Sequence, residues 1–426
     1  MLSKDIKMHV IIPTKNRANT LEWSLRTALN QDYPNYTIWV SDNCSEDNTK
    51  EIALRDNDPR IKYIKPGKRL SMSGHWEFAL DHIDEGYVMI LGDDDGLYPN
   101  IVSKAASLLQ KHPLDAISWV YATYFWPGVG DLFHHPISGT YTINSSSEIL
   151  DIVKKDLFKI RMLPGFYWGF VNISLYKKIK KRDGIFFNSF IPDYYSASIL
   201  AGSIDRFIYS DAAFSICGNS LNSEGGSFLD PEKYGNKRGK EFITENDRPI
   251  HPKLILGKDG ILALTDAYMH ASDRSSKLPK LEIKEFLTQA LISNAAHGTI
   301  QKYNETISLL RQVAIKNNLE DFFNSEIVKH PFVKRDQIKK GSYSFGLNAI
   351  RFLPSDYKIT NVYDASLFGS HYRFSSNLKY VNSLTRKSFA YYFSRLKGLL
   401  FVTWLTFFTR QSKFLMKRYF YSIIGK

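Results

Sequence analysis

Hydrophobic and polar positions alternate in short blocks over the first part of the chain. Apolar runs with the length and composition of β-strands cover residues 9–13, 37–42, 61–64 and 87–91. Segments with apolar residues at helical spacing separate these runs, at residues 18–30, 46–55 and 73–83. Strands that alternate with helices of about ten residues form βαβ units. We therefore predict an α/β fold with a mostly parallel central sheet.

Polar side chains follow three of the predicted strands. Thr14–Arg17 follow the first strand, Asp42 and Asn43 lie at the end of the second, and Asp93–Asp95 follow the fourth. In open α/β sheets, ligands bind at the carboxyl ends of the strands. We therefore expect these three groups to surround one ligand site.

A change of pattern divides the rest of the chain. Residues 116–228 are mixed in pattern and rich in aromatic residues, whereas residues 259–327 have helical spacing. We predict three units from this change and from the composition of the end of the chain. They are an α/β domain over residues 1–250, a helical accessory region over residues 251–385 and a tail over residues 386–426.

The net charge of +13 is concentrated near the C-terminal end of the sequence. Asp364 is the last acidic residue, and residues 365–426 hold 11 Lys and Arg, so the preceding chain is nearly neutral. The tail also contains many Trp, Phe and Leu residues. Its longest uncharged stretch, residues 398–409, is shorter than the roughly 20 residues of a spanning helix. We predict a basic amphipathic tail that binds an anionic membrane surface and no nucleic acid. A helix docked on the body is the alternative.

Cysteine content and the first residues bear on the compartment. Cys44 and Cys217 are the only cysteines, too few for a disulfide framework, which favours a reducing environment. The first residues are charged and lack the apolar region of a secretory signal. Together with the predicted tail, these features predict a cytoplasmic protein, peripheral on the cytoplasmic face of the inner membrane.

The acidic run Asp93–Asp95 is the strongest chemical signal in the sequence. Three carboxylates at the end of an apolar strand repel one another unless a cation compensates them. Mn²⁺ and Mg²⁺ take oxygen ligands of this kind, together with substrate phosphates. The run therefore predicts an Mn²⁺ or Mg²⁺ site that neutralises a diphosphate leaving group. An acidic turn before a helix near Pro99 is the structural alternative.

Three segments in this order, IIPTKNR, WVSDNCSEDNT and ILGDDDGLYP, resemble the family 2 glycosyltransferases of the GT-A type. The resemblance covers the part up to about residue 100 well and weakens toward residue 230. It implies a GT-A fold, a nucleotide diphospho-sugar donor and an inverting transfer. In this family the acidic motif often has the sequence Asp-x-Asp-Asp, and Gly92 stands at its first position here. The family pattern makes Asp94 the usual metal ligand, but strand alternation favours Asp93 and Asp95, so all three are candidates.

The resemblance also implies roles for residues that match the family motifs. The residues expected to bind the nucleotide sugar are Pro13, Thr14, Arg17, Asp42, Asn43, Lys65, Asp93 and Asp94. Among them, Asp42 would accept a hydrogen bond from the base. Lys65 follows the third strand, where it could reach a phosphate or could be an ordinary solvated lysine.

A second candidate lies in FIPDYYSASIL, residues 190–200. Sugar transfer needs a base that takes the proton of the acceptor hydroxyl. In the resembled family an acidic residue that opens a late helix does this, and Asp193 occupies that place. The alternative is an Asp that only stabilises a helix N-terminus. Trp168 is a candidate for the acceptor site, although an aromatic between glycines can equally be packing.

Near Cys217–Phe228 the sequence is polar and glycine-rich, and this loop could close over the diphosphate or remain a surface loop. All these features predict a metal-dependent, inverting glycosyltransferase that acts on a glycan acceptor of a lipid-linked surface polysaccharide. A sugar nucleotidyltransferase would need a glycine-rich basic loop after the first strand, which this sequence lacks. A non-catalytic membrane- or glycan-binding protein would need no base.

Overall fold

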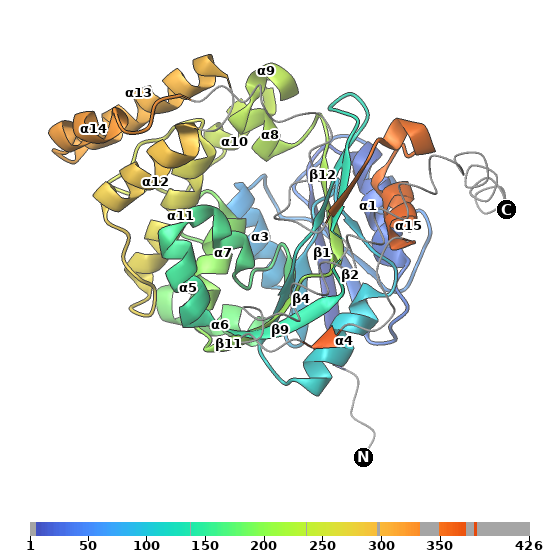
Figure 1. The fold of residues 1–426 in the computed structure, drawn as a ribbon. Coiled ribbons are helices and arrows are strands. Elements are labelled where there is room, and N and C mark those ends of the chain that lie inside the picture. Colours follow the sequence, from blue (N-terminus) through green and yellow to red (C-terminus); the bar gives the residue numbers. More distant parts are fainter. Residues whose placement is uncertain are drawn as a thin grey trace.

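The structure is a computed structural model that describes residues 6–136, 138–235, 237–295, 299–332, 349–371 and 379–380. In these residues, nine strands form one sheet in the order β14-β9-β11-β6-β10-β4-β1-β2-β3. One half is parallel throughout and consists of β1 (Met8–Thr14), β2 (Tyr36–Asp42), β3 (Ile61–Ile64) and β4 (Tyr87–Ile90). Figure 1 shows this half beside the helix α1 (Ala18–Leu29).

The other half of the sheet is mixed. It consists of β6 (Ala116–Trp119), β9 (Thr140–Ser145), β10 (Gly169–Asn172), β11 (Arg206–Ser210) and β14 (Lys379–Tyr380). Strand β10 runs antiparallel to both of its neighbours, β4 and β6, and β9 runs antiparallel to β11. The pairs β6–β11 and β9–β14 are parallel. Most pairs in the sheet are parallel, so the α/β fold class predicted from the sequence is confirmed.

Strand β1 is buried on both faces of the sheet, as its apolar run predicts. Ile11 packs on one side, in a core that includes residues of α3 (Met72–Leu80) and α7 (Pro192–Ala201). Val10 and Ile12 pack on the other side, in a core that includes residues of α1. A parallel strand covered by helices on both faces has no polar alternation, because neither face meets water.

Helices in the first part of the chain follow the sequence prediction with one correction. Helices α1 and α3 agree closely with the expected ranges 18–30 and 73–83. The helix expected at 46–55 is α2 (Thr49–Leu54), so its predicted start at residue 46 is wrong. The carboxylate of Asp47 accepts hydrogen bonds from the backbone N–H groups of Thr49 and Ala18. These bonds hold residue 47 in a loop against α1, and the helix begins after it.

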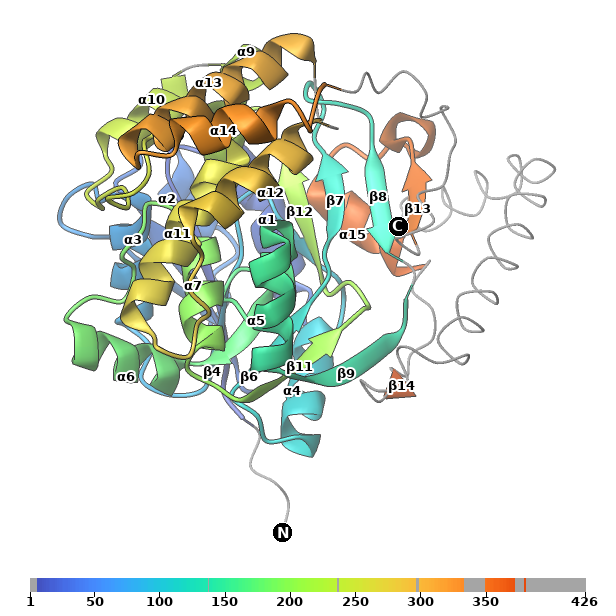
Figure 2. The same cartoon turned by 60° about the vertical axis from the view of Figure 1, so that its left-hand side comes forward.

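A second, smaller sheet lies beside the first. Its strands in order are β13 (Ala349–Phe352), β8 (Phe133–Pro136), β7 (Ala122–Phe125), β12 (Ser215–Asn219) and β5 (Gly96–Leu97). Figure 2 shows β13 next to β8, although the two strands are far apart in the sequence. Strand β12 pairs with β5, which directly follows the acidic run, and so brings residues 215–219 close to Asp93–Asp95.

The predicted helical region is confirmed over residues 260–327. It consists of α11 (Gly260–Arg274), α12 (Ile283–Ala295), α13 (Ile300–Lys316) and α14 (Glu320–Ile327), and α11 packs along α7. After residue 348 the chain returns to the α/β part, where β13 extends the second sheet and α15 (Val362–Ser370) packs against α1. The remaining larger helices are α4 (Ile101–Lys111), α5 (Ser146–Lys155) and α6 (Ile173–Asp183).

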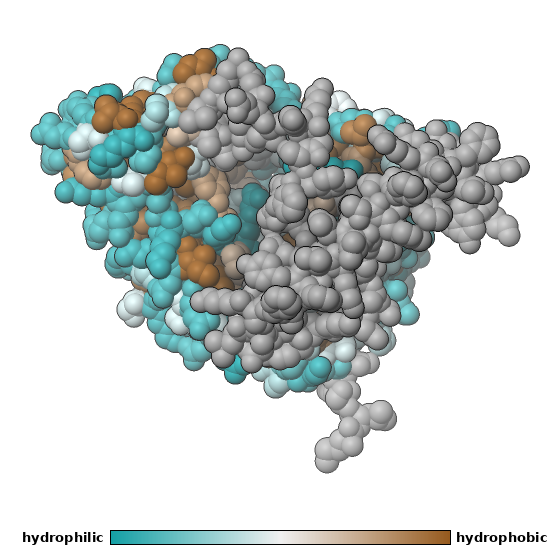
Figure 3. All heavy atoms as spheres, viewed as in Figure 1, coloured by the Kyte–Doolittle hydropathy of each residue, from teal (hydrophilic) through white to brown (hydrophobic). Residues whose placement is uncertain are grey.

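On the face shown in Figure 3, the visible part of the described residues is mostly hydrophilic, with small separate hydrophobic groups. Several exposed apolar residues lie on the helices α12 to α14, including Ile292, Ile300 and Ile315. Within the described ranges, every helix is too short or too polar to cross a membrane. The tail predicted at residues 386–426 lies outside the described residues.

Candidate active site

A cavity of about 440 Å³ lies at the carboxyl ends of β1 and β4. The helices α8 (Glu224–Leu229), α9 (Pro231–Tyr234) and α10 (Lys237–Thr244) lie over this end of the sheet (Figure 1). The predicted site residues that line the cavity are Pro13, Thr14, Arg17, Asn43, Asp93, Asp94, Trp168 and Asp193. The fold therefore brings Asp193 to the acidic run, although the two are far apart in the sequence.

Asp93 is buried and bound on both carboxylate oxygens. The hydroxyl of Thr14 donates a hydrogen bond of 2.7 Å to Oδ2, and Nη1 of Arg17 lies 2.6 Å from Oδ1. Burial raises the pKa of the Asp93 carboxyl, Arg17 counteracts this rise, and the nearby Asp94 adds to it. The end of β1 and the end of β4 are thus joined through Asp93.

Asp94 shares Arg17 with Asp93. Its Oδ2 lies 2.6 Å from Nη2 of Arg17 and accepts a 2.6 Å hydrogen bond from the hydroxyl of Ser220. Burial opposes the charge of Arg17, but the two carboxylates outweigh burial and raise the pKa of the guanidinium. Nε of Arg17 is buried without a hydrogen-bond partner among the described residues. The guanidinium of Arg17 is therefore held by Asp93, Asp94 and the hydroxyl of Ser220, to which its Nη2 donates a 3.1 Å hydrogen bond.

Asp95 is hydrogen-bonded to two backbone amides. Its Oδ1 accepts a 2.7 Å hydrogen bond from the N–H of Gly218, and its Oδ2 accepts one of 3.1 Å from the N–H of Gly92. Asp95 does not line the cavity. A methyl group on Gly92 would lie 2.6 Å from Oδ2 of Asp95. Glycine at the first motif position therefore leaves room for this carboxylate.

Two further predicted residues do not line the cavity. Asp42 is buried, and its carboxylate accepts hydrogen bonds from the hydroxyl of Tyr63 and the N–H of Ser45. Lys65 is exposed to solvent. Asn43 does line the cavity, and its side-chain amide forms two hydrogen bonds with the backbone of Leu70, which fix the loop after β3.

Asp193 opens α7 directly after Pro192, as the sequence predicts. Burial raises the pKa of its carboxyl to about 6, against the opposing effects of the Tyr194 N–H group and the charge of Arg161. A carboxylate with this pKa is ionised at neutral pH and holds a proton more strongly than a solvent-exposed one. Asp193 therefore presents to the cavity a carboxylate that is more basic than a solvent-exposed one.

Aromatic side chains form much of the wall near Asp193. Trp168 is almost fully buried, donates a 2.8 Å hydrogen bond to the carbonyl of Leu163, and packs on Tyr194. The ring of Tyr167, also in the wall, stacks on that of Trp76 with centroids 6.1 Å apart. The wall thus offers a more accessible aromatic face at Tyr167 than at Trp168.

Sequence reasoning did not find several residues that line the cavity. These are His75 and Trp76 from α3, Tyr121 after β6, and Arg161 from the 3-10 helix η1 (Leu157–Met162). Burial lowers the pKa of His75 to about 4, so its ring is neutral at pH 7. The ring lies 2.8 Å from the hydroxyl of Ser41. None of these residues belongs to a recognisable motif, so only the fold reveals them.

The loop predicted at Cys217–Phe228 contributes directly to the cavity. Ser223, Glu224 and Gly226 line it, and residues 224–229 form α8. Lys15, after β1, lies 3.3 Å from Glu224 and 2.8 Å from Glu245, and the side chain of Lys15 is almost buried. Ion pairs therefore join α8 and the end of α10 to the loop after β1.

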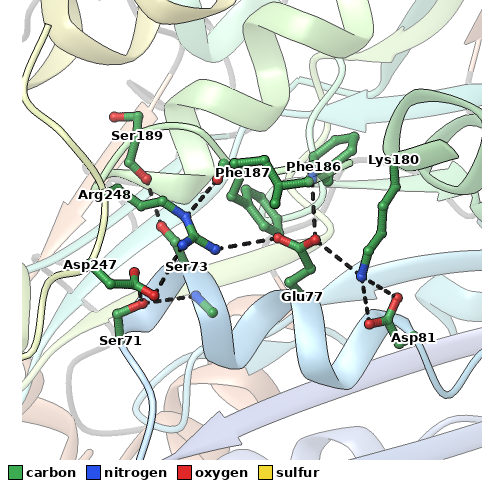
Figure 4. Close-up of polar contacts among 12 residues, drawn as sticks. Ser71, Ser73, Glu77, Asp81, Lys180, Phe186, Phe187, Ser189, Asp247 and Arg248 are labelled. Carbon is green, nitrogen blue, oxygen red and sulfur yellow. Dashed lines mark hydrogen bonds and ion pairs between the residues drawn. The ribbon is translucent and has the colours of Figure 1, made fainter. Parts of the chain in front are cut away.

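A network of polar contacts supports the opposite wall (Figure 4). The carboxylate of Glu77, on α3, accepts a hydrogen bond from the N–H of Phe186 and pairs with Lys180 at 3.1 Å and with Arg248 at 3.5 Å. Arg248 also donates a 2.7 Å hydrogen bond to the carbonyl of Phe187. Glu77 therefore connects α3 with the loop after α6.

The same network reaches the residues before Asp193. The hydroxyl of Ser73 donates a 2.6 Å hydrogen bond to the carbonyl of Ser189 (Figure 4). Helix α3 carries His75 and Trp76 into the cavity wall, and residues 186–191 lead into α7. The network thus fixes two parts of the wall relative to each other.

A larger cavity, of about 1210 Å³, lies between α8–α10 and α13. It contains none of the predicted site residues, but Leu229 and Asp230 line both cavities. The larger cavity therefore adjoins the site without forming part of its charged wall.

Two carboxylates at a strand end of an α/β sheet, Asp93 and Asp94, thus line one cavity with a third carboxylate, Asp193, whose pKa is raised. The sequence model of glycosyl transferase family 2 matches residues 9–174 of the chain. The match agrees with the resemblance to this family that the sequence motifs carry.

Curated relatives resemble part of the chain. The GalNAc(5)-diNAcBac-PP-undecaprenol β-1,3-glucosyltransferase of Campylobacter jejuni is 36% identical over 108 residues, which are 25% of this chain and 34% of that protein. The UDP-Glc:α-D-GlcNAc-diphosphoundecaprenol β-1,3-glucosyltransferase WfgD of Escherichia coli is 28% identical over 120 residues, 28% of this chain and 46% of that protein. The matches span less than half the length of these relatives.

Solved structures show weaker likeness. TarS 1–349 of S. aureus, in complex with UDP, is 16% identical, with 76% of this chain and 91% of that chain covered and a TM-score of 0.44. The mannosyltransferase PcManGT from Pyrobaculum calidifontis, in complex with GDP-Man and Mn²⁺, is 14% identical, with 77% and 88% covered and a TM-score of 0.37.

Proposed function

We propose that this protein transfers a sugar from a nucleotide diphospho-sugar to a hydroxyl of a glycan acceptor, with inversion at the anomeric carbon. The observation that carries the proposal is that Asp93 and Asp94 share one cavity with Asp193. A transferase of this type needs a charged site for the diphosphate and a base for the acceptor, and the cavity has both.

Asp193 takes the acceptor's proton in the proposed reaction. The acceptor oxygen attacks the anomeric carbon while its proton passes to the carboxylate of Asp193. The bond from that carbon to the diphosphate oxygen breaks, and the nucleoside diphosphate leaves with the electron pair. A single displacement of this kind inverts the anomeric centre.

Residues at the strand ends would hold the donor. Pro13, Thr14 and Asn43 form the part of the wall nearest to the ends of β1 and β2. Asp42, behind this wall, fixes the loop through Ser45. We therefore assign Asp42 a supporting role behind the nucleotide site. Lys65, which is exposed, would bind a donor phosphate only if its side chain turned from solvent toward that phosphate.

The acidic run fits a divalent cation in its chemistry. Asp93 and Asp94 supply two buried carboxylates, and the hydroxyls of Thr14 and Ser220 bind the same carboxylates, which gives the oxygen donors that Mn²⁺ and Mg²⁺ prefer. In the structure Arg17 compensates the charges of these two carboxylates. The bound cation would supply charge stabilisation of the leaving diphosphate. Asp95 would support Asp94 from behind.

The acceptor class follows from the curated relatives. Both named relatives act, by their names, on glycans joined through diphosphate to undecaprenol. We therefore propose a lipid-linked glycan of a surface polysaccharide as the acceptor, with Tyr167 and Trp168 beside it. The basic tail at residues 386–426 would hold the protein on the cytoplasmic face of the membrane that carries this acceptor.

Product analysis with the purified full chain tests the proposal. The chain is incubated with a panel of nucleotide diphospho-sugars, Mn²⁺ and short-chain lipid diphosphate sugars, and the released nucleotide is identified. We expect nucleoside diphosphate and an inverted glycosidic product. Release of pyrophosphate instead would indicate a sugar nucleotidyltransferase.

Substitution of the acidic run provides the matched test. Asp94→Ala is expected to abolish transfer while the circular dichroism spectrum stays unchanged. Full metal-dependent activity in this variant would overturn the assignment of the run. Intact vesicle binding with no transfer by any donor would favour a non-catalytic membrane- or glycan-binding protein.

A further inference from the structure

Arg161 brings a positive charge to the cavity wall near Asp193. It lies on η1, and its Nε and Nη2 donate hydrogen bonds of 3.3 and 2.9 Å to the hydroxyl of Tyr194. The guanidinium also lies over the ring of Tyr121, 5.4 Å from its centroid. No carboxylate of the described residues lies within ion-pair distance of this guanidinium.

The charge of Arg161 is retained although protein surrounds the guanidinium. Burial opposes this charge, but the phenol groups of Tyr121 and Tyr194 outweigh burial and raise the pKa of Arg161. The residue as a whole is nevertheless exposed, and it lines the cavity. Its open side therefore faces the space that a substrate would fill.

The unused donors of Arg161 match one class of ligand. A guanidinium has five N–H donors in a planar fork, and the contacts with Tyr194 use only part of them. The remaining edge suits two oxygens of a phosphate or carboxylate, which Arg binds in a bidentate manner. A neutral sugar hydroxyl would satisfy one donor and leave the charge unpaired.

The position of Arg161 assigns this anion to the acceptor. Tyr194, its hydrogen-bond partner, directly follows Asp193, and the charge of Arg161 lowers the pKa of Asp193. The donor's diphosphate has its own cation, Arg17, at the acidic run. Arg161 therefore lies beside the base that activates the acceptor, and not with the groups that bind the donor.

We propose that Arg161, oriented by Tyr194 and Tyr121, forms a subsite that binds a phosphate or carboxylate group of the acceptor. The assignment of the anion to the acceptor rests on the proposed transfer reaction. The anion subsite itself does not depend on that reaction. An acceptor with a diphosphate next to its first sugar, or one with an acidic sugar, would present such a group.

Direct titration tests the subsite without any transfer. Inorganic pyrophosphate and glucuronate are titrated into the full chain without divalent cations and followed by calorimetry. Arg161→Gln should weaken binding of at least one of these anions by about tenfold or more, because a bidentate charge-assisted pair is lost. Arg161→Lys, which keeps the charge but loses the fork, should lie between. Equal affinity of the wild type and Arg161→Gln for both anions overturns the proposal.

Matched variants separate the subsite from other effects. Lys159→Gln removes the same charge from an exposed position on the same 3-10 helix, and is expected to leave both affinities unchanged. Arg17→Gln removes the donor-side cation and controls for pyrophosphate bound at the acidic run. Thermal unfolding of every variant verifies that the fold is retained.

Acceptor kinetics identify the source of the anion and the role of Arg161. The same sugar is offered as a neutral alkyl glycoside, as an alkyl diphosphate and as a uronic acid glycoside. Arg161→Gln should raise the acceptor KM about tenfold for one anionic acceptor, with the donor KM unchanged. An equal loss for neutral and anionic acceptors, with a shifted pH profile, would show that Arg161 only tunes Asp193 and would overturn the subsite.

The two proposals fail in different ways. Loss of anion binding in Arg161→Gln without any sugar transfer by the wild type would support the subsite and reject the transferase. Sugar transfer that is equally sensitive to Arg161→Gln with every acceptor would support the transferase and reject the subsite.

Discussion

Single carboxylates in this site differ in chemistry because their neighbours differ. Asp95 accepts hydrogen bonds from two backbone N–H groups, which fixes it as part of the structure. Asp93 and Asp94 instead share the charge of one arginine side chain, that of Arg17. Asp193 lies at a helix start without an ion pair to a described residue, so its proton affinity is set mainly by burial.

Replacement of Asp193 is expected to remove the base and little else. Asp193→Asn should reduce kcat of sugar transfer by about 10²–10⁴-fold, the range typical of a lost general base. The donor KM should change little, because Asp193 lies apart from the strand-end residues. Steady-state kinetics with Asp93 and Asp94 intact provide the measurement, and wild-type kcat in Asp193→Asn would exclude the role.

The pH dependence of transfer follows from the raised pKa of Asp193. Protonated Asp193 cannot accept the acceptor's proton, so kcat/KM should fall about tenfold per pH unit below pH 6 and level off above it. A pH–rate profile from pH 4.5 to 8 measures this. A profile that stays flat down to pH 4.5 would contradict it.

Gly218 is required by contact with the acidic run. A methyl group at this position would lie 1.8 Å from the backbone oxygen of Asp94. Gly218→Ala should therefore displace Asp94 and lower the free energy of unfolding by about 1–3 kcal/mol, as in other overpacked sites. Gly260→Ala, where a methyl group meets nothing within 4 Å, is the control for urea unfolding. Equal stability of the two variants would show that this contact is relaxed at little cost.

At the scale of single residues, motif positions were easier to predict than their neighbours. Pro13, Thr14 and Arg17 line the cavity as expected, because the end of a parallel strand has few directions in which to continue. The sequence did not distinguish Asp95 from Asp93 and Asp94, since their difference depends on β12, which returns from far along the chain. Arg161 has no motif and is visible only through its contact with Tyr194.

Elements of the site are held together by polar contacts between segments distant in the sequence. Helix α3 contributes His75 and Trp76 to the cavity wall. Its Glu77 binds Arg248, Lys180 and the N–H of Phe186 (Figure 4). The periodicity of residues 73–83 predicted a helix, but the sequence pattern does not indicate which residues its buried Glu77 binds. The positions of the elements therefore depend on contacts that local patterns do not encode.

Loss of Glu77 should destabilise this wall. Glu77→Ala leaves Lys180 paired only with Asp81 and Arg248 only with Asp247, and it leaves the buried N–H of Phe186 without its acceptor, which is expected to cost about 1–3 kcal/mol in the free energy of unfolding. Asp81→Asn is the control, because Asp81 pairs with the same Lys180 but is half exposed, and its loss should cost less than about 1 kcal/mol. Chemical denaturation measures both, and equal small losses would show that the network is not a structural support.

The whole molecule depends on a segment that the sequence placed in a separate helical region. Residues 349–371 supply β13 to the second sheet and α15 to the face of α1, with Val362 and Phe368 buried. The run of helices over 260–327 was predictable from its spacing. The packing of residues 349–371 on the α/β part was not predictable, because the sequence pattern of one short strand and one helix does not indicate where they pack. The division at residue 250 stays a prediction.

Truncation distinguishes this segment from the tail. Removal of the tail, residues 386–426, should leave the unfolding temperature nearly unchanged but abolish binding to anionic vesicles. Removal of residues 333–426 should also lower the free energy of unfolding by about 3–5 kcal/mol, because Val362, Phe368 and their neighbours leave the core. Thermal melts and vesicle co-sedimentation provide the measurements. Equal melting of the two truncated chains would contradict the structural role of β13 and α15.

The pairing of β13 with β8 also has a consequence for biosynthesis. Residues 349–352 of β13 pair with residues 136–133 of β8. After β8 is made, the ribosome must therefore add a length of more than half the whole chain before the second sheet has this edge strand. Synthesis proceeds at about 5–20 residues per second, so β8 waits about ten seconds or more for its partner. During this time its open edge is exposed to other strands. Newly made chains therefore have a period of aggregation risk that the finished enzyme does not share.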